Sequence, residues 1–334
     1  MNVISKNENV FHGRWGLLFL NIGSPNSLDD IPAFMYNIFS DREIIKFPGG
    51  RFLHNLLSRM IVKLRTRKIQ ESYRLIGGKS PLLEITRAQA EGVKEKFRSQ
   101  LEDLEVYVGM RYWNPTAAEA VKKCINDKRE NVVAIPLYPH YSMTTTGSIF
   151  RELDRIIRQL SPQINFIRIE NFHIYPGYIQ AWAEKLRDWR AGFTGKAHLL
   201  FSAHGIPMSF VNKGDPYPRQ IEETAEEIVR KADWIEDWSI SYQSRSGPIR
   251  WLKPNTCEVV EELARKKTNI VILPISFVSE NFETLYEIDI LYKEIARKSG
   301  ALSFHRLLCL NTNQLFIESL CDLIIENIRK NNPA

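Results

Sequence analysis

Cysteine is scarce in this chain of 334 residues, which contains only Cys124, Cys257, Cys309 and Cys321. The four are far apart and form no CxxC pair, so neither a zinc ribbon nor a thioredoxin-like redox motif is indicated. We therefore expect reduced, mostly buried thiols, as in a cytoplasmic protein.

Long hydrophobic runs are also missing. No apolar stretch approaches the roughly 18 residues of a membrane-spanning helix. The N-terminal sequence MNVISKNENVFHGRWG lacks the apolar segment of a signal peptide. We expect a cytoplasmic protein that at most rests on a membrane surface.

Glycine-rich phosphate-binding loops are absent where a nucleotide enzyme would carry them. The first predicted strand is followed by NIGSPNS (21–27), which matches neither GxGxxG nor a P-loop. The net charge of +6, from 45 basic and 39 acidic residues, is too evenly distributed to indicate nucleic-acid binding. It is compatible with an acidic small molecule or an anionic membrane surface as partner.

Short apolar runs recur along the chain and predict strands at 16–22, 104–110, 131–138, 164–170, 198–203, 238–243 and 269–278. Most are continuous rather than alternating, which is typical of strands buried on both faces of a parallel sheet. Charged amphipathic stretches between them predict helices, among them 84–102, 116–128, 178–190 and 220–232. This alternation favours an α/β fold with right-handed crossovers.

The strand–helix pattern occurs twice, which predicts two Rossmann-like lobes with parallel sheets and a cleft between them. We expect the N-terminal lobe over residues 1–155 and the C-terminal lobe over 156–309, with the second set of strands beginning near 164. A terminal helix within 310–334 is expected to complete the first lobe. In such folds ligands bind beyond the carboxyl ends of the strands.

One histidine lies at such a strand end. In LLFSAHGIPMSF (199–210), His204 follows a buried apolar run and precedes Gly205 and Pro207. An imidazole at this position can serve as a base or a metal ligand near neutral pH. A ring that only caps the loop remains the alternative.

A file of carboxylates follows another predicted strand. In SENFETLYEIDILYKE (279–294), the spacing of Glu280, Glu283, Glu287 and Glu294 predicts one acidic stripe on a helix. Together with His204, such a stripe could bind a borderline divalent cation such as Fe²⁺ or Zn²⁺, or take up protons from a substrate. A solvated acidic face is the alternative.

A basic amphipathic helix is predicted within 47–68. Its apolar stripe comprises Phe52, Leu53, Leu56, Leu57, Met60, Ile61 and Leu64. Its basic residues are Arg51, Arg59, Lys63, Arg65, Arg67 and Lys68. Such a helix can rest on an anionic membrane or roof an apolar pocket, or it can be an ordinary helix that faces the core.

Six blocks of sequence, in this order, resemble the ferrochelatase family over most of the chain. They are LFLNIGSPNSLDDIPAFMYNIFSDREII (18–45), YRLIGGKSPL (73–82), PLYPHYSMTTTGS (136–148), FSAHGIP (201–207), YQSRSGPIRWLKP (242–254) and FVSENFETLYEID (277–289). The resemblance implies a lyase of haem biosynthesis, a protohaem ferro-lyase. It would insert Fe²⁺ into protoporphyrin IX held between two Rossmann-like lobes and release two protons.

The resemblance also implies roles for individual residues. His204 and Glu283 match the pair that binds the metal and removes the pyrrole protons, and Glu287 matches the next acid of a relay. The positions that match contacts to the macrocycle or its propionates are Tyr73, Ser80, Arg111 and Trp251. Fe²⁺ is a substrate, and no permanently bound cofactor is expected.

Some positions depart from the family pattern. Many relatives have a histidine where this chain has Asn281, and some have an acid at the position of Leu291. Ile22 occupies a position where relatives that use coproporphyrin often have tyrosine, which favours protoporphyrin. The chain ends at NNPA without a cysteine-rich extension, so no [2Fe–2S] cluster is expected.

Alternative functions remain open at this stage. The chain could act on coproporphyrin III, insert another metal such as cobalt, or be a carrier that binds porphyrin or haem without catalysis. We further expect a monomer, no nucleic-acid partner, and peripheral membrane contact through residues 51–68.

Overall fold

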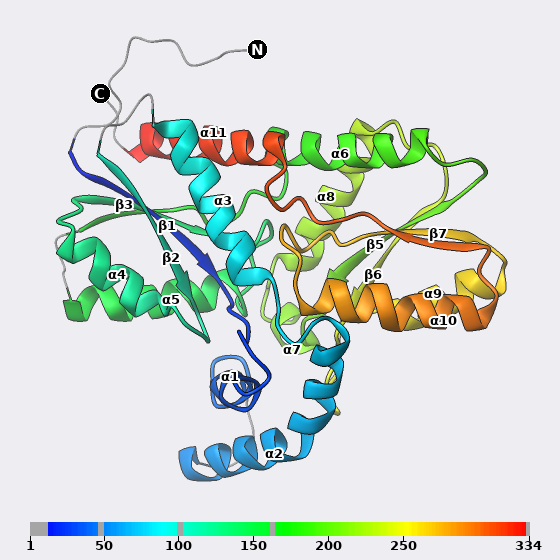
Figure 1. Ribbon diagram of the computed structural model, residues 1–334, viewed down its shortest axis with the longest axis horizontal. Helices are drawn as coiled ribbons and strands as arrows, with labels where there is room; N and C mark the ends of the chain where they lie inside the picture. Colours follow the sequence, from blue (N-terminus) through cyan, green and yellow to red (C-terminus); the bar gives the residue numbers. More distant parts are fainter. Residues whose placement is uncertain (1–12, 46–49, 99–102, 161–163, 332–334) are drawn as a thin grey trace.

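The computed structural model describes residues 13–45, 50–98, 103–160 and 164–331. Within these ranges the strands form two four-stranded parallel sheets that lie side by side (Figure 1). The first sheet has the order β2-β1-β3-β4, with β1 at Trp15–Asn21, β2 at Leu104–Met110, β3 at Asn131–Pro136 and β4 at Asn165–Arg168. The second has the order β6-β5-β7-β8, with β5 at His198–His204, β6 at Trp238–Gln243, β7 at Asn269–Leu273 and β8 at Ser303–Arg306. The expected α/β fold with two parallel sheets is confirmed.

Burial along the strands explains the continuous apolar runs. All seven residues of β1 are buried, as are five of the seven in β5, because both strands lie inside their sheets with helices on both faces. The edge strands β4 and β8 are short and more exposed. The short run of β8, SFHR, was too polar for the apolar pattern to predict.

Helices connect the strands and cover the sheets. The first half contains α1 at Ile31–Phe39, α2 at Arg51–Leu75, α3 at Leu82–Phe97, α4 at Ala117–Asn126 and α5 at Thr146–Leu160. The second half contains α6 at Pro176–Ala191, α7 at Met208–Val211, α8 at Tyr217–Lys231, α9 at Thr256–Arg265, the π-helix η1 at Glu283–Tyr292, α10 at Lys293–Ser299 and α11 at Gln314–Asn331.

One hydrophobic core runs through both sheets. It joins β1 and β3 of the first sheet, β5 and β7 of the second, and helices α3, α6, α8 and α11. Separate clusters fill the opposite faces, with α4 and α5 on the first sheet and α9, η1 and α10 on the second. In Figure 1, α11 and α6 lie along the top of the molecule, and α1 and α2 project at the bottom.

One strand belongs to a different sheet from the one expected. The run 164–170 was predicted to begin the second lobe, but β4 pairs in parallel with β3 and forms the edge of the first sheet. The short connection through α5 returns the chain to the same sheet. The division into lobes at 155/156 stays a prediction, as does the assignment of residues 1–12 and 332–334, which lie outside the described residues.

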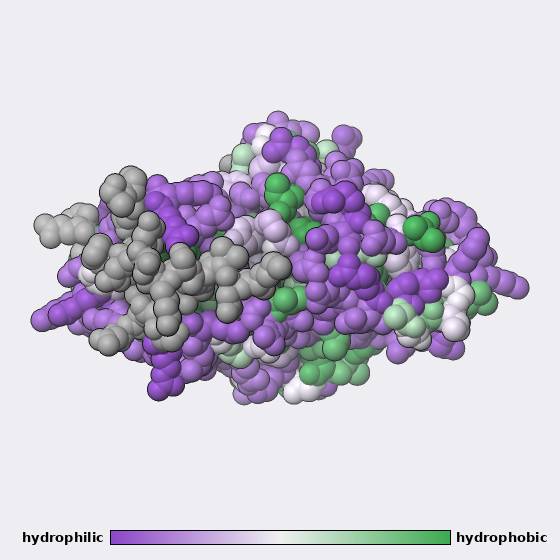
Figure 2. Space-filling view, turned by 90° about the horizontal axis from the view of Figure 1, so that it is seen from above, coloured by the Kyte–Doolittle hydropathy of each residue, from purple (hydrophilic) through white to green (hydrophobic). Residues whose placement is uncertain are grey.

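The upper face of the molecule (Figure 2) and helix α2 differ in how much apolar surface they expose. Figure 2 shows the face above the sheets, where hydrophilic side chains predominate and hydrophobic ones form small separate groups. On α2, by contrast, Phe52, Leu56, Met60 and Leu64 are all at least half exposed. Among the described helices, none combines the length and apolarity needed to cross a bilayer.

Candidate active site

His204 is the last residue of β5, at the carboxyl edge of the second sheet. Both backbone groups of His204 are bonded to side chains: its N–H donates to Ser276 Oγ (2.9 Å) and its carbonyl accepts from Tyr217 Oη (2.9 Å). Gly205 follows because a Cβ there would lie 2.8 Å from the carbonyl oxygen of Gln243. These two bonds and the close approach at Gly205 hold the backbone that carries the imidazole.

The His204 ring is partly buried beside Phe277, with ring centroids 6.1 Å apart in an edge-to-face arrangement. Burial lowers the pKa of His204, and the nearby Glu287 carboxylate opposes this shift. The imidazole is thus neutral at pH 7, the form that can accept a proton or bind a metal.

Glu287, on η1, is held at the same edge by several donors to one oxygen. Its Oε2 accepts from Gln243 Nε2 (3.0 Å), Ser244 Oγ (2.5 Å) and Tyr292 Oη (3.2 Å). Ser244, which donates the shortest of these bonds, has a φ of 66°, an uncommon value for a residue other than glycine. Burial raises the pKa of Glu287, while Ser244, Gln243 and His204 act to lower it.

Removing the Glu287 charge should lower the pKa of His204 further. In metal-free Glu287→Gln the attraction that favours the imidazolium is lost, while burial of the ring remains. The expected result is a His204 titration at lower pH than in the parent protein, followed by NMR of isotope-labelled histidine. Glu294→Gln, on the neighbouring α10 where the side chain is 44% exposed, should leave that titration in place.

Glu283 begins η1, and burial raises the pKa of this carboxyl. Its charge contributes to raising the pKa of Tyr73, the buried tyrosine near the end of α2, although burial is the larger cause. Glu283 also raises the pKa of Glu287, so the two carboxyls of η1 influence each other. His204, Glu287 and Glu283 thus form a continuous electrostatic chain without a direct hydrogen bond between their described side chains.

An aromatic stack lies beside this chain. Tyr73 stacks on Phe282 (ring centroids 4.4 Å apart, planes 13° apart), and Phe282 stacks on Tyr286 (5.2 Å and 21°). Tyr73 was predicted from the sequence as a site residue, whereas Phe282 and Tyr286 were not. The four-residue spacing of Phe282 and Tyr286 was the available signal.

The predicted acidic stripe is wrong as a set of four. Glu280 is buried and paired with Arg306 (2.8 Å), and Glu294 is exposed and paired with Arg297 (2.8 Å). Residues 283–292 form a π-helix, whose backbone bonds span five residues instead of four, so the α-helical spacing does not align all four acids. Of the four acids, Glu287 interacts electrostatically with His204, and Glu283 interacts with Glu287.

Asn281 lies just before this helix, and its side chain bonds to the first turn. Its Oδ1 accepts from the Thr284 N–H (3.0 Å), and Thr284 Oγ1 accepts from the Asn281 N–H (3.1 Å). These reciprocal bonds resemble a capping box. Its Nδ2 donates to the Ser279 carbonyl (3.2 Å), so both ends of the buried amide are occupied.

Asn281→Ala should therefore reduce the free energy of unfolding by about 1 kcal/mol, the usual cost of losing a helix cap. Asn281→Asp keeps the acceptor for the Thr284 N–H and removes only the donor to the Ser279 carbonyl, so it separates the two bonds. Urea unfolding measures both. Equal stability of Asn281→Ala and the parent protein would contradict a capping role.

Trp251 lies on the loop after β6. Its backbone forms an isolated bridge with Pro207, and its ring carbon Cε3 would be 3.7 Å from a Cβ at residue 205. Its indole N–H donates to the Ser246 carbonyl (3.0 Å). The tryptophan is therefore adjacent to the residue that follows His204.

Arg111 follows β2 and is already paired. Its Nη2 donates to Asp41 Oδ2 (2.7 Å), and its Nε donates to Ser148 Oγ (3.2 Å). The same Asp41 oxygen accepts from Tyr112 Oη (2.7 Å). A propionate at Arg111 would have to exchange with, or share, this buried carboxylate partner.

Ser80 is buried just before α3. Its hydroxyl accepts from the Leu82 N–H (3.3 Å) at the start of α3. It lines a cavity of about 660 Å³ that includes Asn26, Arg87 and Asn114 but no other predicted site residue. The structure therefore associates Ser80 with a cavity that His204 does not line.

No three His, Cys, Asp or Glu side chains converge into a ready-made metal site within the described ranges. The arrangement at the sheet edge instead combines an imidazole whose pKa is lowered, two partly buried carboxyls whose pKa values are raised, and stacked aromatic rings. Such a set can accept protons from a flat apolar substrate and can give a cation two kinds of temporary ligand.

Comparison with known proteins identifies the family. A family model described as Ferrochelatase matches residues 14–328. The chain belongs to the ferrochelatase family. A ferrochelatase of Gloeothece citriformis is 42% identical over 326 residues, covering 96% of this chain and 84% of the relative, and one of Cyanothece sp. is 43% identical over 324 residues, covering 95% and 83%.

Solved structures support the architecture. SirB from Bacillus subtilis with Fe³⁺ matches with a TM-score of 0.56 at 13% identity, covering 95% of this chain and 97% of that one. The sirohydrochlorin chelatase SirB in complex with cobalt matches with a TM-score of 0.54 at 10% identity, covering 95% and 96%. At such identities the likeness shows the chelatase fold alone. The expected resemblance, fold class and lyase class of haem biosynthesis are confirmed.

Proposed function

We propose that this ferrochelatase-family chain inserts Fe²⁺ into protoporphyrin IX to form protohaem. The reaction forms bonds from iron to four pyrrole nitrogens and breaks two N–H bonds, so two protons leave for each Fe²⁺ that enters. The observation that carries the proposal is the partly buried His204 imidazole at the carboxyl end of β5, which interacts electrostatically with Glu287 of η1, as Glu287 does with Glu283.

We assign proton removal to His204 and Glu283. His204 can accept a pyrrole proton at pH 7 because burial keeps its ring neutral. Glu283 can receive a proton readily because burial raises its pKa. Both side chains can also give Fe²⁺ a temporary N or O ligand, which suits a metal that must be passed on.

Glu287 fits a relay better than a firm metal ligand. One of its oxygens is engaged by Gln243, Ser244 and Tyr292, and its pKa is raised by burial. A carboxyl in this state can pass a proton from His204 toward the far end of η1. We therefore propose Glu287 as the next group after the reacting pair.

We propose that aromatic side chains hold the macrocycle. Tyr73 is buried against Phe282, so the stack of the two rings offers its flat apolar surface through the partly exposed Phe282, and Trp251 lies on the His204 side. Ring binding of this kind supplies energy that can bend the tetrapyrrole toward a geometry that admits metal. Arg111 and Ser80 are retained as candidate contacts to the propionates.

The apolar Ile22 supports protoporphyrin as the substrate. It lies directly after β1, at the carboxyl edge of the first sheet, and is partly buried. We further propose a monomer in the cytoplasm with no permanently bound cofactor, no iron–sulfur cluster and no nucleic-acid partner. Residues 51–68 of α2 are proposed to contact a membrane surface.

Initial rates under anaerobic conditions test the substrate choice. Purified protein is mixed with protoporphyrin IX or coproporphyrin III, and with Fe²⁺ or Co²⁺, while the porphyrin absorption bands are followed. The fastest metallation is expected with protoporphyrin IX and Fe²⁺. Faster reaction with coproporphyrin III would contradict protoporphyrin IX as the substrate, and faster reaction with Co²⁺ would contradict Fe²⁺ as the metal.

A further inference from the structure

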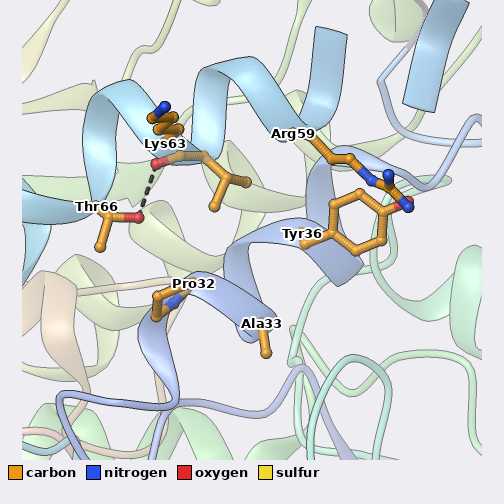
Figure 3. Close-up of a pocket in the computed structure, with 7 residues that line it drawn as sticks. Pro32, Ala33, Tyr36, Arg59, Lys63 and Thr66 are labelled. Atoms are coloured by element: carbon orange, nitrogen blue, oxygen red, sulfur yellow. Dashed lines mark hydrogen bonds between the residues drawn. The ribbon is translucent and has the colours of Figure 1, made fainter. Parts of the chain in front are cut away.

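A second cavity lies between α1 and α2. It measures about 510 Å³ and is lined by Pro32, Ala33, Tyr36, Arg59, Val62, Lys63 and Thr66. In Figure 3 the side chains of α1 lie below and those of α2 above, with the Arg59 guanidinium beside the Tyr36 ring. None of these residues belongs to the proposed active site.

Two cations of this cavity have no acidic partner among the described residues. Arg59 lies over the face of Tyr36, with its Cζ 5.8 Å from the ring centroid, and makes no ion pair. Lys63 follows one turn later and makes none either. Arg67, the next basic residue in this row, is by contrast paired with Glu71 (3.2 Å).

An exposed apolar row runs next to these cations. The side chains of Phe52, Met60 and Leu64 are 83%, 54% and 76% exposed, and Leu56 is 50% exposed. Their four-residue spacing places them along one side of the helix, adjacent to the turn-spaced cations of the cavity. Leaving large apolar side chains in water beside unpaired cations is typical of helices that lie at a membrane interface.

We infer that the cavity between α1 and α2 binds the anionic headgroup of a membrane phospholipid. The phosphate would pair with Arg59 and Lys63, while Phe52, Met60 and Leu64 enter the apolar layer beneath the headgroups. This inference rests on the membrane contact proposed for residues 51–68 and adds its ligand class. A free phosphate ion would neutralise the two cations but would leave the apolar row in water.

Vesicle co-sedimentation without porphyrin or iron tests the inference. The parent chain should bind vesicles of phosphatidylcholine with phosphatidylglycerol at least tenfold more tightly than phosphatidylcholine alone. The double variant Arg59→Gln/Lys63→Gln should lose most of that preference. Lys68→Gln/Arg74→Gln removes the same charge from exposed positions of α2 outside the cavity and should weaken binding by no more than about threefold.

The possible outcomes separate the two proposals. Failure of the parent chain to bind either vesicle would overturn the membrane contact itself. Equal losses in the two double variants would overturn the headgroup site, because diffuse attraction would then explain binding. Displacement from vesicles by millimolar inorganic phosphate at constant ionic strength would mean a free-anion site and would also overturn it.

The apolar row has its own test. Phe52→Ser/Met60→Ser keeps the charge and should weaken binding to the anionic vesicles several-fold. Unchanged binding would contradict insertion of these side chains. Thermal unfolding of each variant verifies that the fold is retained, and the metallation assay reports separately on the proposed function.

Discussion

His204→Ala is expected to lower kcat for iron insertion by about 100-fold or more, with little change in the dissociation constant for protoporphyrin. The magnitude is that of removing a positioned base. Porphyrin binding should persist because the aromatic surfaces of Tyr73 and Trp251 are untouched. Anaerobic metallation rates and quenching of protein fluorescence by porphyrin measure the two quantities separately.

The same strand provides a matched control. His198 lies at the opposite end of β5, where its ring bonds Ser239 Oγ (2.8 Å), so His198→Ala removes an imidazole from a similar backbone. Its kcat should stay within about twofold of the parent value. Added imidazole should restore part of the rate only in His204→Ala. A near-normal rate in His204→Ala would remove this residue from the mechanism.

Glu283→Gln is the second substitution with a large expected effect. The amide fills the same volume but cannot accept a proton, so kcat should again fall by about 100-fold. Because the Glu283 charge raises the pKa of Glu287, that pKa should decrease in the variant. The pH dependence of the residual rate is therefore expected to move to lower pH.

Glu294→Gln is the control for this change. Glu294 lies on α10, where its side chain is 44% exposed and pairs with Arg297 and Lys298. Its rate and pH dependence should match those of the parent chain. Equal rate losses in both variants would indicate a general effect of charge, and Glu283 would then have no special part in proton removal.

Much of the fold was predictable because buried parallel strands leave a strong local signal. The runs at 104–110 and 238–243 match β2 and β6 residue for residue, and His204 lies at the strand end where it was expected. An apolar run predicts a strand but does not predict which sheet that strand joins. The sequence near 164 was therefore assigned to the wrong sheet, since β4 pairs with β3 through contacts distant in the chain.

The candidate site was less predictable because it depends on backbone geometry. A π-helix leaves no simple spacing pattern in the sequence. The spacing of an α-helix was therefore assumed, and it placed Glu280 and Glu294 on the same stripe as Glu283. The pairing of Glu280 with Arg306 depends on a strand that the apolar pattern did not reveal. The capping bonds of Asn281 likewise follow from where this helix begins.

The most direct test of the central claim is a count of turnovers. Purified chain is incubated anaerobically with a hundredfold excess of protoporphyrin IX and Fe²⁺, and protohaem is quantified over time. The account predicts many molecules of protohaem per chain, and loss of this multiple turnover in His204→Ala. Saturable porphyrin binding with no metallation above the uncatalysed rate would contradict it and would indicate a carrier.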